Sequence, residues 1–391
     1  MRVLTVVDAL KLGGAETLIA QLGRVSADAD IELSVLSLHG RSPERSKLEP
    51  LLRESGVEPE YLDVQRTLDV AGFRRLVALL KQTRPDVVHA HLEMSMTMAI
   101  PAARRAGIPA VGTFHHVHRP LSGRASARER LAVEIATRSA ATIFVSQASL
   151  TSFADRYRRS RPVPASWTVV HNGIDLDYFT PAPGGGVAPL PTDLGLGLDS
   201  PGNGPVVTIL AALRDFKGIT HAIDGWPAVL AAQPTARLLL VGSGEEEPAL
   251  RAQVARLNLT GSVIFAGMRS DVPDVLRGSD LVVLPSIYGE NLPTVLMEAG
   301  GCGRPVVASD VGGISDIVAD GETGLLVPPG DSPGIAAAIL TLLADPDLRN
   351  RMGEAGRHRM ERLFDARGWA RALHAVYQKA IDANGRVAVT A

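Results

Sequence analysis

The sequence predicts an α/β protein made of two parallel-sheet halves, and three observations support this prediction. Short apolar runs alternate with helical patterns, which is typical of βαβ units in a parallel sheet. This alternation occurs twice, once before and once after a Gly/Pro-rich stretch at residues 181–205. The chain of 391 residues is also long enough for two domains that each have a sizeable core.

The first half, residues 1–180, carries six apolar runs that we expect to form parallel strands. Helical patterns separate them, the clearest lying at residues 15–22, 44–54 and 73–81. The expected strands are 2–8, 31–38, 86–91, 110–114, 142–146 and 168–171.

The stretch 181–205 cannot sustain a helix or a central strand, because Gly and Pro dominate it. We therefore expect a linker with a mobile loop there. A second alternating set follows in residues 206–365, with turns expected at 320–328, and a helix ends the chain within residues 366–391. The expected strands are 206–211, 237–241, 263–266, 281–284 and 306–309, and the expected late helices are 334–343, 346–363 and 366–382.

Both halves are thus expected to be doubly wound sheets with Rossmann-like architecture. Ligands of such sheets bind beyond the carboxyl ends of the strands. Two halves that face each other would enclose a central cleft, which is a common place for a small-molecule site.

Composition excludes several classes of protein. A net charge of −2 argues against a dedicated nucleic-acid binder. The single Cys302 excludes an internal disulfide framework and suits a reducing compartment. The first apolar run is interrupted by Asp8, unlike a signal peptide, and no uncharged apolar run approaches the roughly 18 residues that span a bilayer. We therefore expect a cytoplasmic protein.

Basic residues concentrate in part of the first half. Residues 101–161 hold 11 Arg and only 3 acidic residues, although the whole chain is nearly neutral. Runs of charge are usually solvated helix faces. The alternative is an anionic partner, either a charged acceptor molecule or weak peripheral contact with a membrane through the segment that Arg119 and Arg161 delimit.

The most informative stretch is residues 284–303, LPSIYGENLPTVLMEAGGCG. It follows the expected strand 281–284, so Glu290 lies in the loop at a carboxyl end, and Pro293 is expected to be the first residue of a helix. Glu298 then lies about two turns along that helix. Backbone N–H groups near Leu292 and Thr294 are free donors at a positive helix end. The two carboxylates can accept hydrogen bonds from hydroxyl groups, and the start of the helix can bind an anion. A nucleotide sugar has both kinds of group.

The motif Glu, seven residues, Glu lies behind Pro-Ser and ahead of GRPVVA at residues 303–308. It resembles the signature of retaining glycosyltransferases of family 4, which have the GT-B fold. The resemblance extends over nearly the whole chain and is densest at 261–329. It implies a metal-independent hexosyltransferase without a cofactor, which moves a sugar from a nucleoside diphosphate sugar, with a UDP-sugar favoured, to an unidentified acceptor hydroxyl. It also implies that the last helix crosses back onto the first domain.

The resemblance assigns roles to the second half. Lys217 matches the family's Lys-Gly pair and would hold the donor diphosphate, but Ala212 occupies the position of the family's Arg. Arg214, two residues on, is the candidate substitute. The remaining assignments are the backbone of Leu292 for the diphosphate, Glu298 for the ribose, Glu290 and Asn291 for the sugar, and the loop at Gly267 and Met268 for the base.

The first half supplies two further candidates. Gly13-Gly14-Ala15-Glu16 follows the first strand and is similar to a family loop, so the backbone of Gly14 is expected at the phosphates. The string Thr-Phe-His ending at His115 is similar to the family's active-site His, which contacts the transferred sugar. The expected catalytic residues are therefore His115, Lys217 and Glu290.

His115, His116 and His118 also raise the hypothesis of a metal site. No acidic residue lies close to them in the sequence, so His116 and His118 are interpreted as polar loop residues and no metal is expected. Two other functions stay open. One is a nucleotide-sugar 2-epimerase of the same fold, and the other is a protein that binds a sugar nucleotide without turning it over.

Overall fold

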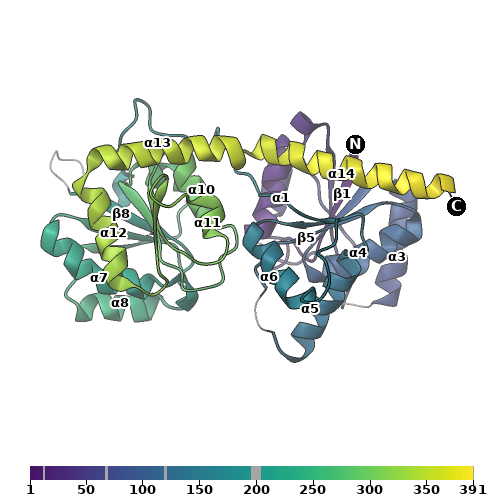
Figure 1. Ribbon diagram of the computed structural model, residues 1–391, viewed down its shortest axis with the longest axis horizontal. Coiled ribbons are helices and arrows are strands. Elements are labelled where there is room, and N and C mark those ends of the chain that lie inside the picture. Colours follow the sequence, from purple (N-terminus) through teal and green to yellow (C-terminus); the bar gives the residue numbers. More distant parts are fainter. Residues whose placement is uncertain (12–13, 67–68, 119–120, 195–203, 391) are drawn as a thin grey trace. The chain divides into compact units, whose positions relative to one another are not determined.

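The computed structural model describes residues 1–11, 14–66, 69–118, 121–194 and 204–390. The chain forms two compact units (Figure 1). The first comprises Met1–Gly173 and Asp365–Ala391, and the second comprises Ile174–Phe364. The units thus divide at residues 173 and 364, whereas the sequence places the domain ends at 180 and 365.

The first unit contains a parallel sheet that has seven strands among the described residues, in the order β3-β2-β1-β4-β5-β6-β7. β3 is not predicted from sequence, because two residues are too short to show a pattern; Glu60 pairs with Leu36 of β2. The strands are β1 Arg2–Val7, β2 Glu32–Ser37, β3 Glu60–Tyr61, β4 Val87–His91, β5 Ala110–Phe114, β6 Ala141–Phe144 and β7 Trp167–Val169.

The helices of the first unit connect these strands. Helix α2 begins at Glu49, not near residue 44 as predicted, because the side chain of Ser42 accepts a hydrogen bond from the backbone N–H of Arg45 and supports turns there. The helices are η1 Ala27–Ala29, α1 Gly14–Val25, α2 Glu49–Glu54, α3 Val70–Thr83, α4 Glu93–Ala106, α5 Gly123–Ala136, α6 Gln147–Tyr157 and α14 Ala366–Thr390.

The last helix, α14, belongs to the first unit although it ends the chain. Its buried face carries Trp369, Leu373 and Tyr377, which pack into one apolar cluster with Val3 of β1 and Val87 of β4. Figure 1 shows α14 in yellow along the first unit. The first sheet therefore buries one side against a segment that lies more than a full domain away in sequence.

The second unit contains a parallel sheet with six described strands in the order β10-β9-β8-β11-β12-β13. The prediction of turns throughout residues 320–328 is wrong for Gly324–Val327, which forms edge strand β13 and pairs with β12 from Val306 onward. The strands are β8 Val206–Leu210, β9 Arg237–Val241, β10 Val263–Gly267, β11 Leu281–Leu284, β12 Val306–Ser309 and β13 Gly324–Val327.

Helices flank the second sheet. Leu190, from the stretch expected to be a linker, is buried against Val206 and Val275, so the described part of that stretch packs onto the second unit. The helices are η2 Thr192–Leu194, η3 Asp215–Lys217, α7 Ile219–Ala232, α8 Glu247–Arg256, α9 Val272–Arg277, α10 Thr294–Gly301, α11 Ile314–Ile317, α12 Ser332–Ala344 and α13 Pro346–Leu363.

Strand order reverses once in each sheet, between β1 and β4 in the first and between β8 and β11 in the second. Loops that leave the carboxyl ends at such a point diverge to opposite faces and leave a crevice where ligands bind. The loops after β1, β4, β8 and β11 are therefore the places to look for a site. In the described ranges, no helix is long and apolar enough to cross a membrane.

Candidate functional site

In the second unit, the structure brings Lys217 and Glu290 together. Lys217 ends the one-turn helix η3 after β8, and Glu290 lies in the loop after β11. The Lys217 Nζ is 2.5 Å from the Glu290 Oε1, and the Ser286 hydroxyl donates to the same oxygen at 2.6 Å. Glu290 is buried, with 6% of its surface exposed. This buried ion pair therefore lies at the point where the strand order reverses.

Two glycines permit this close approach of loops. Gly218 follows Lys217 with φ of 62°, and a Cβ there would overlap the carbonyl oxygen of Pro285 in the loop after β11. Gly312 has φ of 60°, and a Cβ there would overlap the carbonyl oxygen of Glu290. Only glycine tolerates both the left-handed conformation and the contact. These glycines hold the Glu290 loop between the chain after β8 and the chain after β12.

Helix α10 begins one residue later than predicted, at Thr294, with Pro293 as its N-cap residue. Pro293 has extended backbone angles, and its side chain offers no cap to the first turn of the helix. Uncapped N–H groups at a positive helix end favour an anion. Asn291 and Leu292, which precede the helix, are both buried, each with 7% of its surface exposed.

Glu298 lies in the second turn of α10 and is half-buried. Burial raises the pKa of Glu298 to about 7, against a smaller lowering by a hydrogen bond with Thr294. The environment of Glu298 therefore disfavours its charged form. A hydrogen bond donated by a ligand hydroxyl would stabilise the carboxylate in place of the water molecules that burial removes.

The structure does not place Arg214 with the buried pair. The Arg214 side chain is 55% exposed, and its Nε lies 3.8 Å from a carboxylate oxygen of Glu245. The side chain of Lys217, in contrast, is only 16% exposed. Gly267 ends β10 with φ of 66°, and Met268 after it is 76% exposed. Both of these residues lie at the same carboxyl edge of the sheet.

In the first unit, His115 follows β5 and contacts His91, the last residue of β4. The Nδ1 of His91 is 2.8 Å from the Nε2 of His115, and the rings are stacked with centroids 5.1 Å apart. Burial lowers the pKa of His115 to about 3 and lowers that of His91 well below its usual range. Both rings are therefore neutral near pH 7.

Two features at the β1/β4 reversal were not predicted from the sequence. Asp8, directly after β1, accepts hydrogen bonds from the backbone N–H and the hydroxyl of Ser95 at 2.7 and 2.5 Å, and burial raises its pKa. Leu92 between β4 and α4 has φ of 71° and ψ of 167°, which is strained for a residue with a side chain. The available signals were the Asp at a strand end and the His-x-His at the end of β4.

Helix α1 begins at Gly14, and Gly13 lies outside the described residues.

No acidic residue is adjacent to the His cluster in the sequence, but the structure places one against it. Glu129 of α5 is fully buried and accepts hydrogen bonds from His118 Nδ1 at 2.6 Å and from the Tyr157 hydroxyl at 2.5 Å. His116 Nε2 is 3.2 Å from its other oxygen. Burial raises the pKa of Glu129, but hydrogen bonds from His116, Tyr157 and His118 outweigh this and lower it below its usual value. The acid comes from a helix more than ten residues later, which adjacent sequence cannot reveal.

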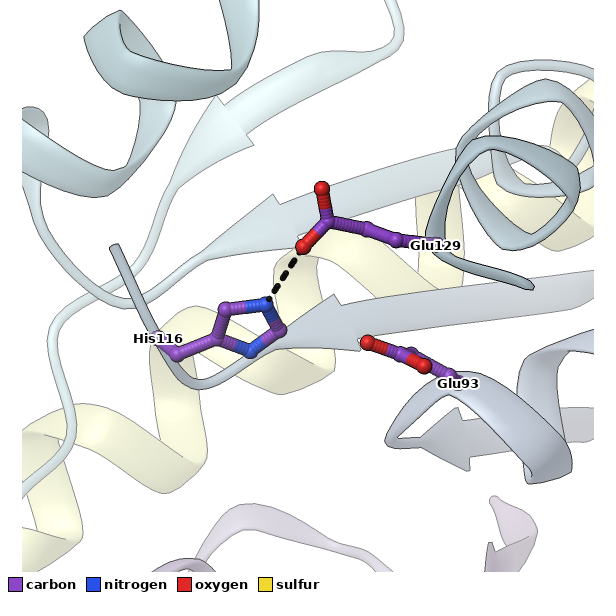
Figure 2. A group of neighbouring side chains, drawn as sticks. All are labelled: Glu93, His116 and Glu129. Atoms are coloured by element: carbon purple, nitrogen blue, oxygen red, sulfur yellow. Dashed lines mark hydrogen bonds and ion pairs between the residues drawn. The ribbon is translucent and has the colours of Figure 1, made fainter. Parts of the chain in front are cut away.

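Figure 2 shows the ring of His116 beside the carboxylates of both Glu129 and Glu93. One ligand atom from each of the three residues lies within 4.8 Å of the others, a spacing that could hold a metal ion. The hydrogen bonds to Glu129 already compensate its buried charge and tie the loop after β5 to α5 and α6. That loop carries His115, so the cluster has a clear structural use.

Comparisons with known proteins cover both units. The model of Glycosyltransferase Family 4 matches residues 12–178, and that of Glycosyl transferases group 1 matches residues 197–359. Glycogen synthase of Mycobacterium tuberculosis is 30% identical over 78% of this chain and 72% of its own. D-inositol 3-phosphate glycosyltransferase of Acidothermus cellulolyticus is 31% identical over 86% of this chain and 79% of its own.

Solved structures show the same fold. The structure of Anabaena HepE in complex with UDP is similar with a TM-score of 0.83 and 24% identity, over 97% of this chain and 100% of that one. The HepE structure in complex with UDP-glucose gives a TM-score of 0.78 and 25% identity over 96% and 98%. The prediction of two Rossmann-like parallel-sheet domains in the GT-B class is confirmed. The chain belongs to glycosyltransferase family 4, the group 1 glycosyl transferases, and is a glycosyltransferase that uses nucleotide-sugar donors.

Proposed function

We propose that this protein transfers a hexose from a UDP-sugar to an acceptor hydroxyl, with retention of the anomeric configuration and without a metal ion. The observation that carries the proposal is the buried Lys217–Glu290 pair near the start of α10, where the N-cap residue Pro293 provides no side-chain cap. The similarity to HepE, which has been solved with UDP-glucose, supports the choice of donor.

The second unit would hold most of the donor. Lys217 and the backbone N–H of Leu292 are assigned to the diphosphate, and Glu298 to the ribose hydroxyls. Glu290 and Asn291 are assigned to the sugar. The loop at Gly267 and Met268 would contact the base. From the first unit, the backbone of Gly14 is assigned to the diphosphate and His115 to the sugar.

The reaction needs stabilisation of a leaving diphosphate. As the bond between the anomeric carbon and the phosphate oxygen breaks, negative charge grows on the β-phosphate, and a fixed ammonium and helix N–H groups stabilise that charge. The acceptor oxygen forms its bond on the same face of the sugar, and its proton passes to the departing phosphate oxygen. No protein nucleophile is needed, and Glu290 is ill suited to be one because Lys217 and Ser286 both engage one of its carboxylate oxygens.

The Lys217–Glu290 pair also suggests which groups of the donor are needed to open it. The charge of Lys217 is balanced by Glu290 at 2.5 Å. An incoming diphosphate would compete for the ammonium group, and the hydroxyls of the sugar would donate to the carboxylate. The pair would thus open only when both the phosphate and the sugar of the donor are present.

The acceptor is proposed to be anionic and to bind the first unit. Of the Arg-rich segment, Arg119 lies outside the described residues, and Arg158 is held by the Thr137 hydroxyl at 2.7 Å and lies over the Trp167 ring. The others are exposed, which leaves their charge available to a partner. These are Arg124, Arg128, Arg130, Arg138, Arg156, Arg159 and Arg161. A relative named for D-inositol 3-phosphate supports an anionic acceptor.

The experiment is a nucleotide screen followed by product analysis. Thermal shift with UDP, GDP and ADP identifies the base, and incubation of the matching sugar nucleotide with acceptor mixtures is followed by mass spectrometry. The coupling constant of the anomeric proton in the product then reports its configuration. An inverted product, or activity lost with EDTA and restored by one metal, would overturn those parts of the proposal. Free sugar-nucleotide isomers without acceptor would indicate a 2-epimerase, and an intact donor would indicate a binding protein.

A further inference from the structure

We propose that His91 is a positioning residue for His115. A single proton lies in the hydrogen bond between His91 Nδ1 and His115 Nε2, so His91 occupies one nitrogen of His115 and leaves Nδ1 to contact the sugar. This inference rests on the proposed function, which assigns His115 to the transferred sugar. The resemblance that identified His115 gives no role to His91.

The geometry holds the two rings as a unit. His91 is the last residue of β4 and pairs in register with Thr113 of β5, and His115 is two residues beyond Thr113. The 2.8 Å contact joins His91 Nδ1 to His115 Nε2. It therefore uses the nitrogen of His115 that is more distant from its own backbone and fixes the plane of the ring.

His91 itself rests on a fixed support. The ring of His89, on the same strand face, lies with its centroid 4.0 Å from that of His91. His89 is hydrogen-bonded on both nitrogens, to the Tyr377 hydroxyl at 2.7 Å and to the Thr113 hydroxyl at 2.6 Å. A chain of contacts thus runs from α14 through β4 to the ring of His115. Such packed support gives a functional side chain its precise position.

Counting protons gives the second part of the inference. A neutral imidazole has one N–H donor and one acceptor nitrogen. Either His91 Nδ1 donates to His115 Nε2, or the reverse. In the first case His115 Nδ1 carries its proton and His91 Nε2 is an acceptor; in the second the outer nitrogens exchange these roles. The outer atoms of the pair therefore always comprise one donor and one acceptor.

Those two outer atoms are unused in the described structure. Both the Nδ1 of His115 and the Nε2 of His91 are buried without a hydrogen-bond partner among the described residues. A buried polar atom without a partner is costly and points to a ligand or water that completes it. A sugar hydroxyl can donate or accept, so the His115 nitrogen can serve it in either state. Removal of the His91 Nδ1 would leave the ring of His115 free to rotate and lose that alignment.

The test compares two amides at position 91. In His91→Asn the amide lies near the place of Nδ1 and can donate to or accept from His115, whereas in His91→Gln it lies near the place of Nε2. We expect His91→Asn to keep turnover within about threefold, and His91→Gln to lose about tenfold in kcat, the scale of one lost hydrogen bond. Affinity for UDP should stay unchanged in both, because His115 is assigned to the sugar. In the His115→Ala background, His91→Gln should cause no further loss.

Tyr377→Phe is the matched control, because it removes a buried hydrogen bond of the same chain of contacts without touching His115. It should lower Tm and reduce kcat by less than His91→Gln does, because the hydrogen bond between His91 and His115 remains. The proposal is overturned if His91→Asn and His91→Gln have equal kcat, or if Tyr377→Phe lowers kcat as much as His91→Gln. Imidazole ¹⁵N shifts give an independent readout, since His91→Gln should remove the hydrogen bond at His115 Nε2 and Tyr377→Phe should not. A fully active His115→Ala would instead remove the sugar assignment of the proposed function.

Discussion

Lys217 has two roles in this protein, because it neutralises a buried carboxylate and is the proposed cation for the diphosphate. Burying a charge is costly unless it is paired and hydrogen-bonded, and Glu290 has both Lys217 and Ser286 at one oxygen. The family pattern places an Arg where this chain has Ala212, and the substitute Arg214 is exposed and associated with Glu245. More of the electrostatic stabilisation should therefore fall to Lys217.

We predict that Lys217→Ala lowers kcat by about a hundredfold, roughly 3 kcal/mol, the scale for one preorganised charge-stabilising group. Arg214→Ala is the control, with an expected loss of less than about threefold because exposed ion pairs contribute little. Steady-state kinetics with a saturating donor measure both, and Tm shows whether the unpaired Glu290 destabilises the fold. A larger loss in Arg214→Ala would show that the family's Arg has been replaced after all.

Glu298 gives a prediction about pH. Burial raises its pKa to about 7 from an ordinary 4.5, so the folded chain binds a proton that the unfolded chain has released between these values. Stability from this group is therefore complete below about pH 4.5 and is lost as pH rises through 7. Glu298→Gln should flatten the fall of Tm across this window. If Tm of both proteins falls in parallel, the side chain does not titrate as stated.

At the scale of elements, the reversal of strand order and two glycines define the site of the second unit. Gly312 shares a positive φ with Gly321, but a Cβ at Gly312 would overlap the carbonyl oxygen of Glu290, whereas one at Gly321 would meet nothing within 4 Å. An alanine at Gly321 would therefore introduce backbone strain alone, whereas an alanine at Gly312 would introduce the same strain and also displace Glu290.

Gly321→Ala should cost about 1–2 kcal/mol of unfolding free energy, the penalty for a left-handed residue with a side chain. Gly312→Ala should cost more and should also lower kcat, because the loop that carries Glu290 must shift. Chemical denaturation and turnover assays check the pair. Equal stability losses with normal turnover in both variants would mean that the loop tolerates the displacement.

The exposed Arg residues for which we propose an anionic partner lie on helices α5 and α6 and in the segments that directly follow them. Attraction to anionic lipid is worth about 1 kcal/mol per basic residue near the surface and is screened by salt. If the partner is a membrane, the protein should co-sediment with phosphatidylserine vesicles at low salt and be released at high salt. The triple variant Arg124→Ser, Arg128→Ser, Arg130→Ser should bind less, and neutral vesicles serve as the control. Absence of binding at low salt would leave a charged acceptor molecule as the use of these residues.

At the scale of the whole molecule, the core of the first unit forms only when α14, at the end of the chain, packs against strands from its beginning. Trp369, Leu373 and Tyr377 of α14 bury themselves against β1, β4 and α1. The second unit has its own large apolar cluster, which contains Trp226 and Val283 and no residue of α14. Each unit should therefore respond separately to a mutation in its own core.

Trp369→Ala should destabilise the first unit by about 3–5 kcal/mol, the usual cost of removing a large buried aromatic side chain. Calorimetry should show one transition at a lower temperature and a second that is unchanged. UDP should still raise the temperature of the unchanged transition, since most donor contacts are assigned to the second unit. A single transition that shifts as a whole would mean that the two units unfold together.

The sequence by itself determined the two alternating strand–helix sets, the Glu290–Glu298 motif and the positions of Lys217 and His115 at strand ends, because apolar periodicity and turn residues are local properties. The tertiary structure decided which strand ends lie together. Lys217 and Glu290 are 73 residues apart, and His91 and His115 are 24 apart. Their contacts depend on strand order, which is set by crossovers and not by adjacent residues. The two-residue β3, the edge strand β13 and the carboxylate of Glu129 beside the His cluster depend on that same long-range packing, which a pattern of neighbouring residues does not encode.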